Sequence, residues 1–280
     1  MSGHILLQAE ITGATAPGPD LRAAGFTVHD FTARDTGWRE ALGCLDRELQ
    51  GQPLLAFVSL DAAGHIRRRC ATLARGLIFR PERLRHHIWS SLVPEPLQLN
   101  RRYVMMPFGH LAGRAREIGV LFGARVFLRP DSALKVFPGQ TVDVRDLDRT
   151  VSMLRQLHAV QDEELVVVDR SRLINRHEHR FWLSQGAVVT QAAYTFGASG
   201  VSGDHPAPAC PAVVMEMAAT LFERAPMLAS VDDALVADFA VETTGRVSLV
   251  ELNAWSTSGF YPGMDVVAAA RAGLDALGSP

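Results

Sequence analysis

The last third of the chain carries three oxygen-bearing side chains whose spacing suits a metal ion. Glu251 and Asn253 lie two residues apart in a strand-like segment, and Asp238 lies in the apolar segment before it. Alternate side chains of a strand point to one face, and antiparallel pairing would set Asp238 opposite the other two. Two carboxylates and an amide oxygen are hard ligands of the kind that Mg²⁺ prefers. We therefore predict a metal site; the alternative is a polar sheet face open to water.

A lone lysine marks a second place for chemistry. Of the 28 basic residues, 27 are arginines and one is a lysine, Lys135. The wide planar fork of arginine does not replace a compact ammonium among phosphate oxygens, so a retained lysine points to such a contact. Arg129 lies in the strand-like run RVFLRP, and the short turn DSAL separates that run from Lys135. The two cations would clamp phosphate groups at the rim of a sheet; an ordinary surface lysine is the alternative.

The third candidate is the segment HEHRFWL, residues 177–183. Glu178 and Arg180 share one face of a predicted strand that also carries bulky aromatic residues. A buried arginine needs an anionic partner, which here would be Glu178 or the phosphate of a ligand. His177 and His179 also share a face, but the sequence offers no third ligand that would complete a zinc site.

The elements that must position these residues begin with alternating strands and helices. In the first hundred residues, short apolar runs separated by helix-like segments predict a β-α-β-α-β unit with a small parallel sheet. No GxGxxG follows a strand, so this unit lacks the signature of a dinucleotide site. The predicted strands are 4–10, 26–31 and 53–60, and the predicted helices are 20–25, 38–50 and 61–74.

The rest of the chain predicts an α+β arrangement. Extended structure is expected to resume over 135–139 after the DSAL turn, and 197–208 is expected to be a flexible loop. A change in pattern near residue 100 predicts an N-terminal βα domain over 1–100 and a second domain over 101–280. Other predicted strands are 125–130, 164–169 and the hairpins 179–194 and 234–253; other predicted helices are 81–92, 111–122, 146–160, 211–225 and 265–277.

Composition excludes several classes of protein. With 280 residues, 48% of them hydrophobic and 21% charged, the chain has the balance of an ordinary globular protein. A net charge of −2 gives no support for nucleic-acid binding. No apolar run approaches the roughly 20 residues that span a bilayer, and the start of the chain lacks a secretory pattern. Three widely spaced cysteines fit neither a zinc site nor a disulfide framework, so we expect a cytoplasmic protein.

Taken in order, three segments resemble the ATP-grasp superfamily. They are VFLRPDSALKVFPG, ELVVVDRSRLINRHEHRFWL and VADFAVETTGRVSLVELNAWSTSGFYP. The similarity is to a compact bacterial and phage clade in which an Arg on a strand and a Lys after a turn hold the phosphates. The resemblance implies an α/β protein in which ATP lies between two α+β lobes, preceded by an N-terminal βαβ domain. A long glycine loop over the phosphates, found in many ATP-grasp enzymes, is not evident here.

The resemblance also implies a role for each candidate. Lys135 and Arg129 would hold the phosphates, and Arg180 would stabilise the transferring phosphoryl group, so that Lys135 and Arg180 are the predicted catalytic residues. Strand 164–169 would serve as the adenine hinge. Other predicted nucleotide contacts are the backbones of Val166, Val167 and Val168, the side chain of Asp169 near the ribose, and Glu178; the predicted magnesium ligands are Asp238, Glu251 and Asn253.

The implied chemistry is ligation in small-molecule or peptide biosynthesis. A substrate carboxylate would attack the γ-phosphate of ATP, and an amine would then displace phosphate from the acylphosphate. The expected partners are small-molecule or peptide carboxylates and amines, without a membrane or nucleic acid, and a homodimer is left open. Small residues over 256–259, with Tyr261, would line the substrate pocket. A kinase on the same fold and an ATP-binding module without turnover are the alternatives.

Overall fold

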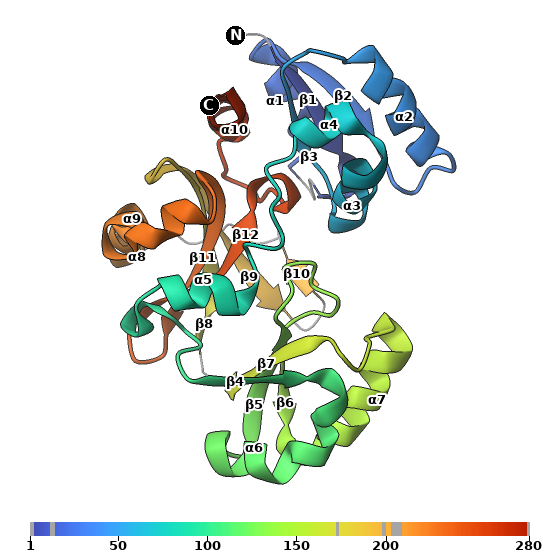
Figure 1. Cartoon of the computed structure of the whole chain (residues 1–280). Helices are drawn as coiled ribbons and strands as arrows, with labels where there is room; N and C mark the ends of the chain where they lie inside the picture. Colours follow the sequence, from blue (N-terminus) through green and yellow to red (C-terminus); the bar gives the residue numbers. More distant parts are fainter. Residues whose placement is uncertain (1–2, 12–14, 172–173, 198–199, 203–208, 279–280) are drawn as a thin grey trace.

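Within the residues that the structure describes, three β-sheets and their helices build the protein. The computed structural model describes residues 3–11, 15–171, 174–197, 200–202 and 209–278. Figure 1 shows the N-terminal sheet at the top, a five-stranded sheet in the middle and a four-stranded sheet at the bottom. The mixed α/β architecture predicted from the sequence is confirmed.

The N-terminal sheet is parallel, with strand order β2-β1-β3. Parallel neighbours cannot be joined by a tight turn, and the intervening helices provide the crossovers that they need. Every residue of the third strand is buried, as its uninterrupted apolar sequence predicts. The elements are β1 (His4–Gln8), α1 (Gly18–Ala23), β2 (Thr27–Phe31), α2 (Trp38–Glu48) and β3 (Leu54–Phe57).

The predicted helix over 61–74 is interrupted. It forms α3 (Leu60–Arg69) and α4 (Ala71–Arg75). The residue between them, Cys70, has φ −130° and ψ 88°, which is outside the helical region. The sequence pattern did not reveal this break, because the apolar positions on both sides of it continue at helical spacing.

Two further predicted helices differ in extent. Only the second half of 81–92 is helical, as α5 (His86–Leu92), because the chain just before it is extended. The predicted helix over 211–225 forms α8 (Ala212–Ala219) and α9 (Leu221–Arg224). These shorter helices still pack their apolar residues against the sheets, which is why the pattern was recognisable.

The four-stranded sheet is antiparallel, with strand order β4-β7-β5-β6. Helices cover the face that carries Val126, Leu128 and Val168, which belong to a separate buried core. Residues between these along a strand, such as Phe127 and Arg129, therefore face the other way, towards the five-stranded sheet. The elements are β4 (Tyr103–Pro107), α6 (Ala115–Phe122), β5 (Arg125–Pro130), β6 (Gln140–Asp143), α7 (Leu147–His158) and β7 (Leu165–Arg170).

The loop between β5 and β6 differs from the prediction. Lys135 does not resume extended structure; its φ is 49°, and its N–H donates to the carbonyl of Ser132 at 3.2 Å, which closes a turn. The next strand starts only at Gln140. Gly139 packs directly against β5, because a Cβ at this position would lie 2.7 Å from Cζ of Phe127. The loop thus folds back onto the sheet before β6 begins.

The five-stranded sheet has the order β10-β9-β8-β11-β12, and both predicted hairpins are confirmed. Gln185 and Gly186, with φ of 49° and 80°, form the expected tight turn. Part of the predicted loop 197–208 is strand β10, and 198–199 and 203–208 lie outside the described residues. The strands are β8 (Ile174–Ser184), β9 (Ala187–Gly197), β10 (Gly200–Ser202), β11 (Ala234–Glu242) and β12 (Val247–Ala254).

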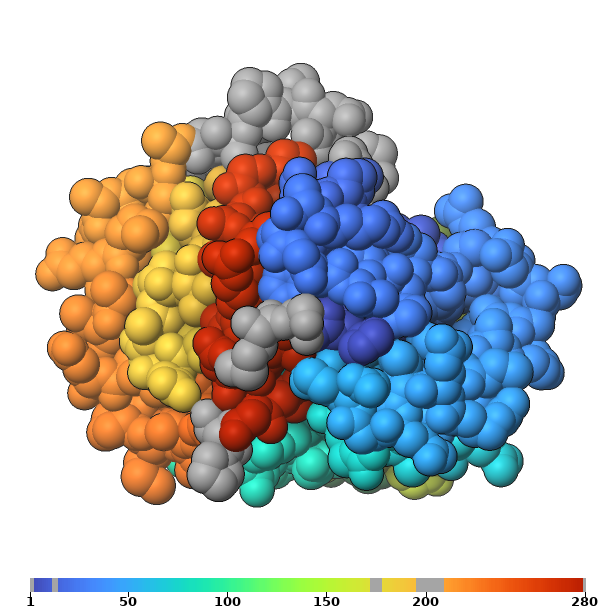
Figure 2. Space-filling model, turned by 90° about the horizontal axis from the view of Figure 1, so that it is seen from above, coloured from blue at the N-terminus to red at the C-terminus, as the bar shows by residue number. Residues whose placement is uncertain are grey.

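The C-terminal helix α10 (Val266–Gly278) joins the N-terminal sheet to the five-stranded sheet. In Figure 2 the red C-terminal segment lies between the blue N-terminal elements and the yellow and orange segments. Gly273 permits this approach, since a Cβ there would lie 2.6 Å from Leu55 Cδ2 and 2.7 Å from Trp255 Nε1. One buried cluster combines Leu55 with Trp182 of β8. Buried side chains therefore join the two sides of residue 100, and the predicted domain division stays a prediction.

Short 3₁₀ helices fill several connections. Within the described ranges, no helix is long and apolar enough to cross a bilayer. The 3₁₀ helices are Ala9–Ile11, Glu95–Leu97, Phe108–His110, Ala112–Arg114, Val144–Asp146, Pro226–Ser230 and Trp255–Thr257.

Candidate active site

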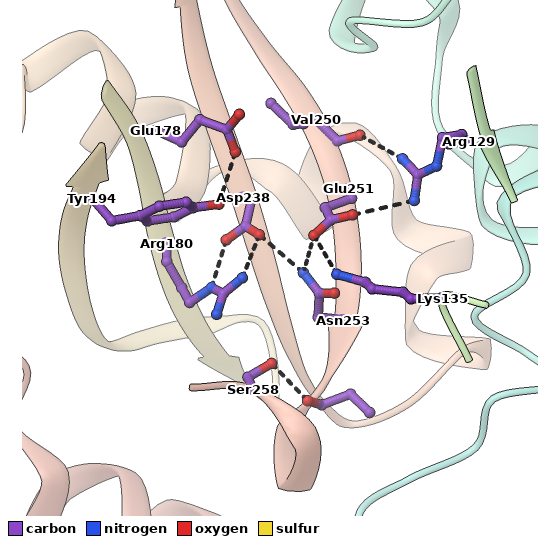
Figure 3. Close-up of polar contacts among 11 residues, drawn as sticks. Arg129, Lys135, Glu178, Arg180, Tyr194, Asp238, Val250, Glu251, Asn253 and Ser258 are labelled. Carbon is purple, nitrogen blue, oxygen red and sulfur yellow. Dashed lines mark hydrogen bonds and ion pairs between the residues drawn. The ribbon is translucent and has the colours of Figure 1, made fainter. Parts of the chain in front are cut away.

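The strand pair β11·β12 brings the three candidate metal ligands together. Asp238 lies directly opposite Glu251 in the antiparallel register, and the register shifts just after this pair. Nδ2 of Asn253 donates hydrogen bonds to Asp238 Oδ2 and Glu251 Oε1, each at 3.0 Å (Figure 3). The side chains therefore converge as the alternation of the strand predicts, while their role as metal ligands stays a prediction.

Two cations reach the same carboxylate from the four-stranded sheet. Lys135 Nζ donates to Glu251 Oε1 at 2.8 Å, and Arg129 Nη2 donates to Glu251 Oε2 at 3.2 Å (Figure 3). Arg129 Nη1 also donates to the carbonyl of Val250 at 3.4 Å. Burial opposes ionisation of Glu251, but Lys135 and Arg129 outweigh it and hold the pKa of this carboxyl well below its usual range. The predicted phosphate-clamping and metal-binding residues thus meet at one carboxylate.

Arg180 has a different partner from the one expected. Its Nε donates to Asp238 Oδ1 at 2.8 Å and its Nη2 to Asp238 Oδ2 at 2.7 Å, so the pair is bidentate, and both side chains are buried. Asp238 is the cross-strand neighbour of Arg180, whereas Glu178 lies two residues away on the same strand. Burial alone would lower the pKa of Arg180, but Asp238 raises it well above its ordinary value.

Glu178 belongs to an aromatic cluster beside this ion pair. The hydroxyl of Tyr194 donates to Glu178 Oε2 at 2.7 Å. The ring of Tyr194 stacks on Tyr261 with centroids 4.7 Å apart, and the guanidinium of Arg180 lies 5.2 Å from each ring centre. Burial and the charge of Asp238 raise the pKa of Glu178 to about 8. Glu178 is therefore largely protonated at neutral pH and can donate a hydrogen bond.

A cleft between the four-stranded and five-stranded sheets contains these residues. It has a volume of about 410 Å³. Phe127, two residues before Arg129 on β5, offers an aromatic ring to it, a contribution that sequence reasoning missed although strand alternation places both on one face. The lining residues are Phe127, Arg129, Pro130, Lys135, Phe137, Pro138, Gly139, Gln140, Thr141, Glu178, Val250 and Glu251.

The predicted adenine hinge is wrong for Val166, Val167 and Val168. These residues lie in β7, which is paired with β4 on one side and β5 on the other. Their backbone N–H and C=O groups therefore make sheet hydrogen bonds and cannot read the edge of a base. Asp169, near the end of the same strand, is buried, and its Oδ1 accepts a hydrogen bond from the N–H of Arg170 at 2.6 Å.

Asp131, which sequence reasoning took as part of a simple turn, anchors the loop that carries Lys135. Its fully buried carboxylate accepts hydrogen bonds from Arg85 Nε at 2.7 Å and from the N–H of His87 at 2.9 Å, and it lies 2.9 Å from His87 Nδ1. Burial opposes ionisation, but the hydrogen bonds from His87 and Arg85 lower the pKa of Asp131. The segment 83–89, considered above as a candidate anionic contact, therefore binds an acidic residue of this chain.

The oxygen donors around Glu251 fit a magnesium ion better than zinc. Asp238, Glu251 and Asn253 offer two carboxylates and an amide oxygen, the hard donors that Mg²⁺ prefers. Among the described residues no group of three or more His, Cys, Asp and Glu side chains could hold a metal ion. The side chain of His177, half of the considered zinc pair, lies outside the described part of the chain.

The residues predicted to line a substrate pocket divide into two kinds. Ser256 Oγ accepts a hydrogen bond from the N–H of Ile78 at 2.9 Å, and Ser258 Oγ donates to the carbonyl of Ala254 at 2.8 Å. Both serines are buried, so they fix the loop after β12. Thr257 between them lines a small cavity next to Lys135.

Comparisons with known proteins agree on the fold. A family model described as an ATP-grasp domain, the third family of its clade, matches residues 18–273. The structure is similar to D-cycloserine synthetase DcsG, with a TM-score of 0.58 and 12% identity over 98% of this chain and 100% of that chain. It is also similar to D-alanyl-alanine synthetase A from Vibrio cholerae, with a TM-score of 0.54 and 10% identity over 99% of each chain. No curated sequence matches the chain.

Proposed function

The chain belongs to this ATP-grasp domain family, and on that premise we propose that it is an ATP-dependent carboxylate–amine ligase working through an acylphosphate. The observation that carries this proposal is the meeting of Lys135 and Arg129 with Glu251 across the cleft. Phosphoryl transfer needs positioned cations and metal ligands more than a protein nucleophile. The chemistry of the neighbours named above, both synthetases, supports C–N bond formation.

The residues of the cleft divide the work. Arg129 and Lys135 would hold the phosphates of ATP, which is a substrate of the reaction. Arg180, bound to Asp238 through two of its five donors, keeps others for the transferring phosphoryl group. Asp238, Glu251 and Asn253 would hold Mg²⁺, which supplies charge neutralisation for the phosphate oxygens. Phe127 would pack against the base, and Asp169 and Glu178 would bind the nucleoside.

The proposed reaction has two steps. In the first, a carboxylate oxygen of the acid attacks the γ-phosphorus, and the bond to the bridging oxygen breaks, so that ADP leaves with the electron pair. In the second, the amine nitrogen attacks the acyl carbon of the acylphosphate, the carbon–oxygen bond breaks, and inorganic phosphate leaves. The nitrogen releases a proton, and the product is an amide. Exclusion of water protects the acylphosphate between the two steps. A cytoplasmic location, where ATP is supplied, is part of this proposal.

The experiment that tests the proposal follows phosphorus. The purified protein is incubated with Mg-ATP, panels of carboxylates and either amines or hydroxylamine, and ³¹P NMR and ADP assays follow the products. A ligase releases inorganic phosphate and, with hydroxylamine, forms a hydroxamate. A kinase would retain the phosphate on its product, and a module that only binds ATP would bind an analogue in calorimetry but form no ADP. Either of these results would overturn the ligase proposal.

A further inference from the structure

Two cavities meet at Arg129 and Lys135. Both residues line the 410 Å³ cleft assigned to the nucleotide, and both also line a second cavity of about 50 Å³. The smaller cavity lies towards the N-terminal unit, because its other walls include Leu60 at the start of α3 and Phe79. The two cations therefore stand between the nucleotide cleft and a separate small space.

The smaller cavity combines a cationic end with an apolar wall. Leu60, Phe79 and Leu84 form that wall, and the last two are 5% and 3% exposed. None of the described residues that line the cavity is acidic. An ammonium group placed there would lose its hydration without gaining a counter-charge, which is costly. A neutral hydrocarbon chain pays no such penalty.

The size of the cavity limits what it can hold. A water molecule needs roughly 10–15 Å³ on the same measure. The volume of about 50 Å³ therefore has room for on the order of four non-hydrogen atoms. Asn253 and Thr257 add polar groups near the cations, so the cavity offers a polar end for a carboxylate and an apolar end for a short chain.

We infer that this cavity receives the acyl chain of the carboxylate substrate, and that this substrate is a short, uncharged aliphatic acid. The inference rests on the proposed ligase function. The carboxylate lies at the Arg129–Lys135 end, facing the γ-phosphate on the other side of the cations, and the chain lies against Phe79 and Leu84. One carboxylate oxygen attacks the γ-phosphorus as described above, with ADP as the leaving group.

An acid series tests the inference. Acetate, propionate, isobutyrate, isovalerate, hexanoate and alanine are each given to the enzyme with Mg-ATP and hydroxylamine, and ADP and hydroxamate are measured. Calorimetry with a non-hydrolysable ATP analogue measures binding of the same acids without turnover. We expect kcat/KM and affinity to be greatest at about three to five carbons, and to fall about tenfold or more for hexanoate and for alanine, whose ammonium has no partner in the cavity.

Variants then tie the selectivity to the cavity. Leu84→Ala should raise the ratio of hexanoate to propionate turnover about tenfold. Leu49→Ala is the matched control, since Leu49 is also 3% exposed in the same core but does not line the cavity; it should leave the ratio unchanged. Ala133→Val, in the loop before Lys135, narrows the cavity without opening the core and should favour acetate.

The outcomes separate the inference from the function on which it rests. If ADP forms equally well with long or ammonium-bearing acids, or if neither Leu84→Ala nor Ala133→Val changes the selectivity, the acyl-chain assignment is wrong and the ligase proposal stands. If no acid supports ADP formation and none binds beside the analogue, the ligase proposal and the inference fail together.

Discussion

Two regions supply the charged groups of the cleft, and they are held in place differently. The carboxylate hairpin, β11 and β12, sets its acidic residues by neighbouring strand pairing and by a buried ion pair to β8. The cation segment, residues 125–139, places Lys135 in a turn whose start is tied through Asp131 to Arg85 and His87. The hairpin is thus fixed by local register, and the cation segment by contacts distant in sequence.

This difference separates chemistry from stability. In the hairpin, Asp238 is fully buried and pairs with a buried arginine, so its loss should affect folding. At the tip of the cation segment, the Lys135 side chain is 40% exposed, so it is free to act on a ligand while contributing little to the fold. The residues between these extremes should show intermediate effects.

The largest expected effect is on turnover. Lys135→Ala should lower ADP formation on the order of 10⁴-fold, because it removes the compact cation assigned to the transferring phosphate. Its free energy of unfolding should change by less than about 1 kcal/mol, because the ion pair with Glu251 is partly exposed to solvent. Steady-state kinetics and urea unfolding provide the two measurements.

A surface cation provides the control for Lys135. Arg145 is 81% exposed and contacts Asp143 at 3.5 Å, outside the cleft. Arg145→Ala removes a comparable charge and should leave turnover unchanged. Full activity in Lys135→Ala would remove the central assignment of the proposed site.

The next effect falls on the hairpin and on stability. Asp238→Ala should lower the free energy of unfolding by about 4 kcal/mol, because it leaves the buried guanidinium of Arg180 without its counter-charge. Urea denaturation monitored by circular dichroism measures the change. The double variant Arg180→Met, Asp238→Leu removes both charges together and should recover most of the loss. A loss below about 1 kcal/mol in the single variant would show that this ion pair does not hold the hairpin.

The two regions also differ in how far the sequence predicts them. Glu251 and Asn253 are two residues apart, and Asp238 reaches them across a hairpin, so strand alternation was enough to bring them together. Lys135 was recognisable by composition. The partner of Arg180 was missed, because the sequence does not tell which strand β8 pairs with. The hinge failed because an apolar run such as 164–169 indicates a buried strand but not that both of its edges are paired.

The third prediction concerns the anchor of the cation segment. Asp131→Ala should lower the free energy of unfolding by about 3 kcal/mol, because Arg85 and His87 lose a buried charged acceptor. It should also raise the KM for ATP about tenfold, since a looser turn holds Lys135 less well. Asp146→Ala, at an exposed carboxylate in the same sheet's connections, should change neither quantity. A stability loss with an unchanged KM for ATP would restrict Asp131 to a structural role.

The last and smallest effect concerns the packing behind that anchor, where His86 is buried. Its ring lies 4.8 Å from the rings of Trp89 and of Tyr103, and within the described structure neither ring nitrogen has a hydrogen-bond partner. Burial, with a smaller effect from the charge of Arg129, lowers the pKa of His86 to about 3 from an ordinary value of 6.5. The folded protein thus keeps this imidazole neutral at pH values where the unfolded chain protonates it.

The sign of the pH dependence follows from this difference. Between pH 6.5 and 3 the unfolded state binds a proton at His86 that the folded state does not, so the free energy of unfolding falls as the pH falls. From pH 7 to pH 5 this one group should cost about 2 kcal/mol. His86→Phe keeps an aromatic ring and removes the titration, so the wild-type protein should lose about 2 kcal/mol more than the variant over this range. Urea unfolding of both proteins at pH 7 and pH 5 measures this difference; parallel losses would mean that protons reach His86 in the folded state as easily as in the unfolded one, and that the support behind the cation segment is open to water.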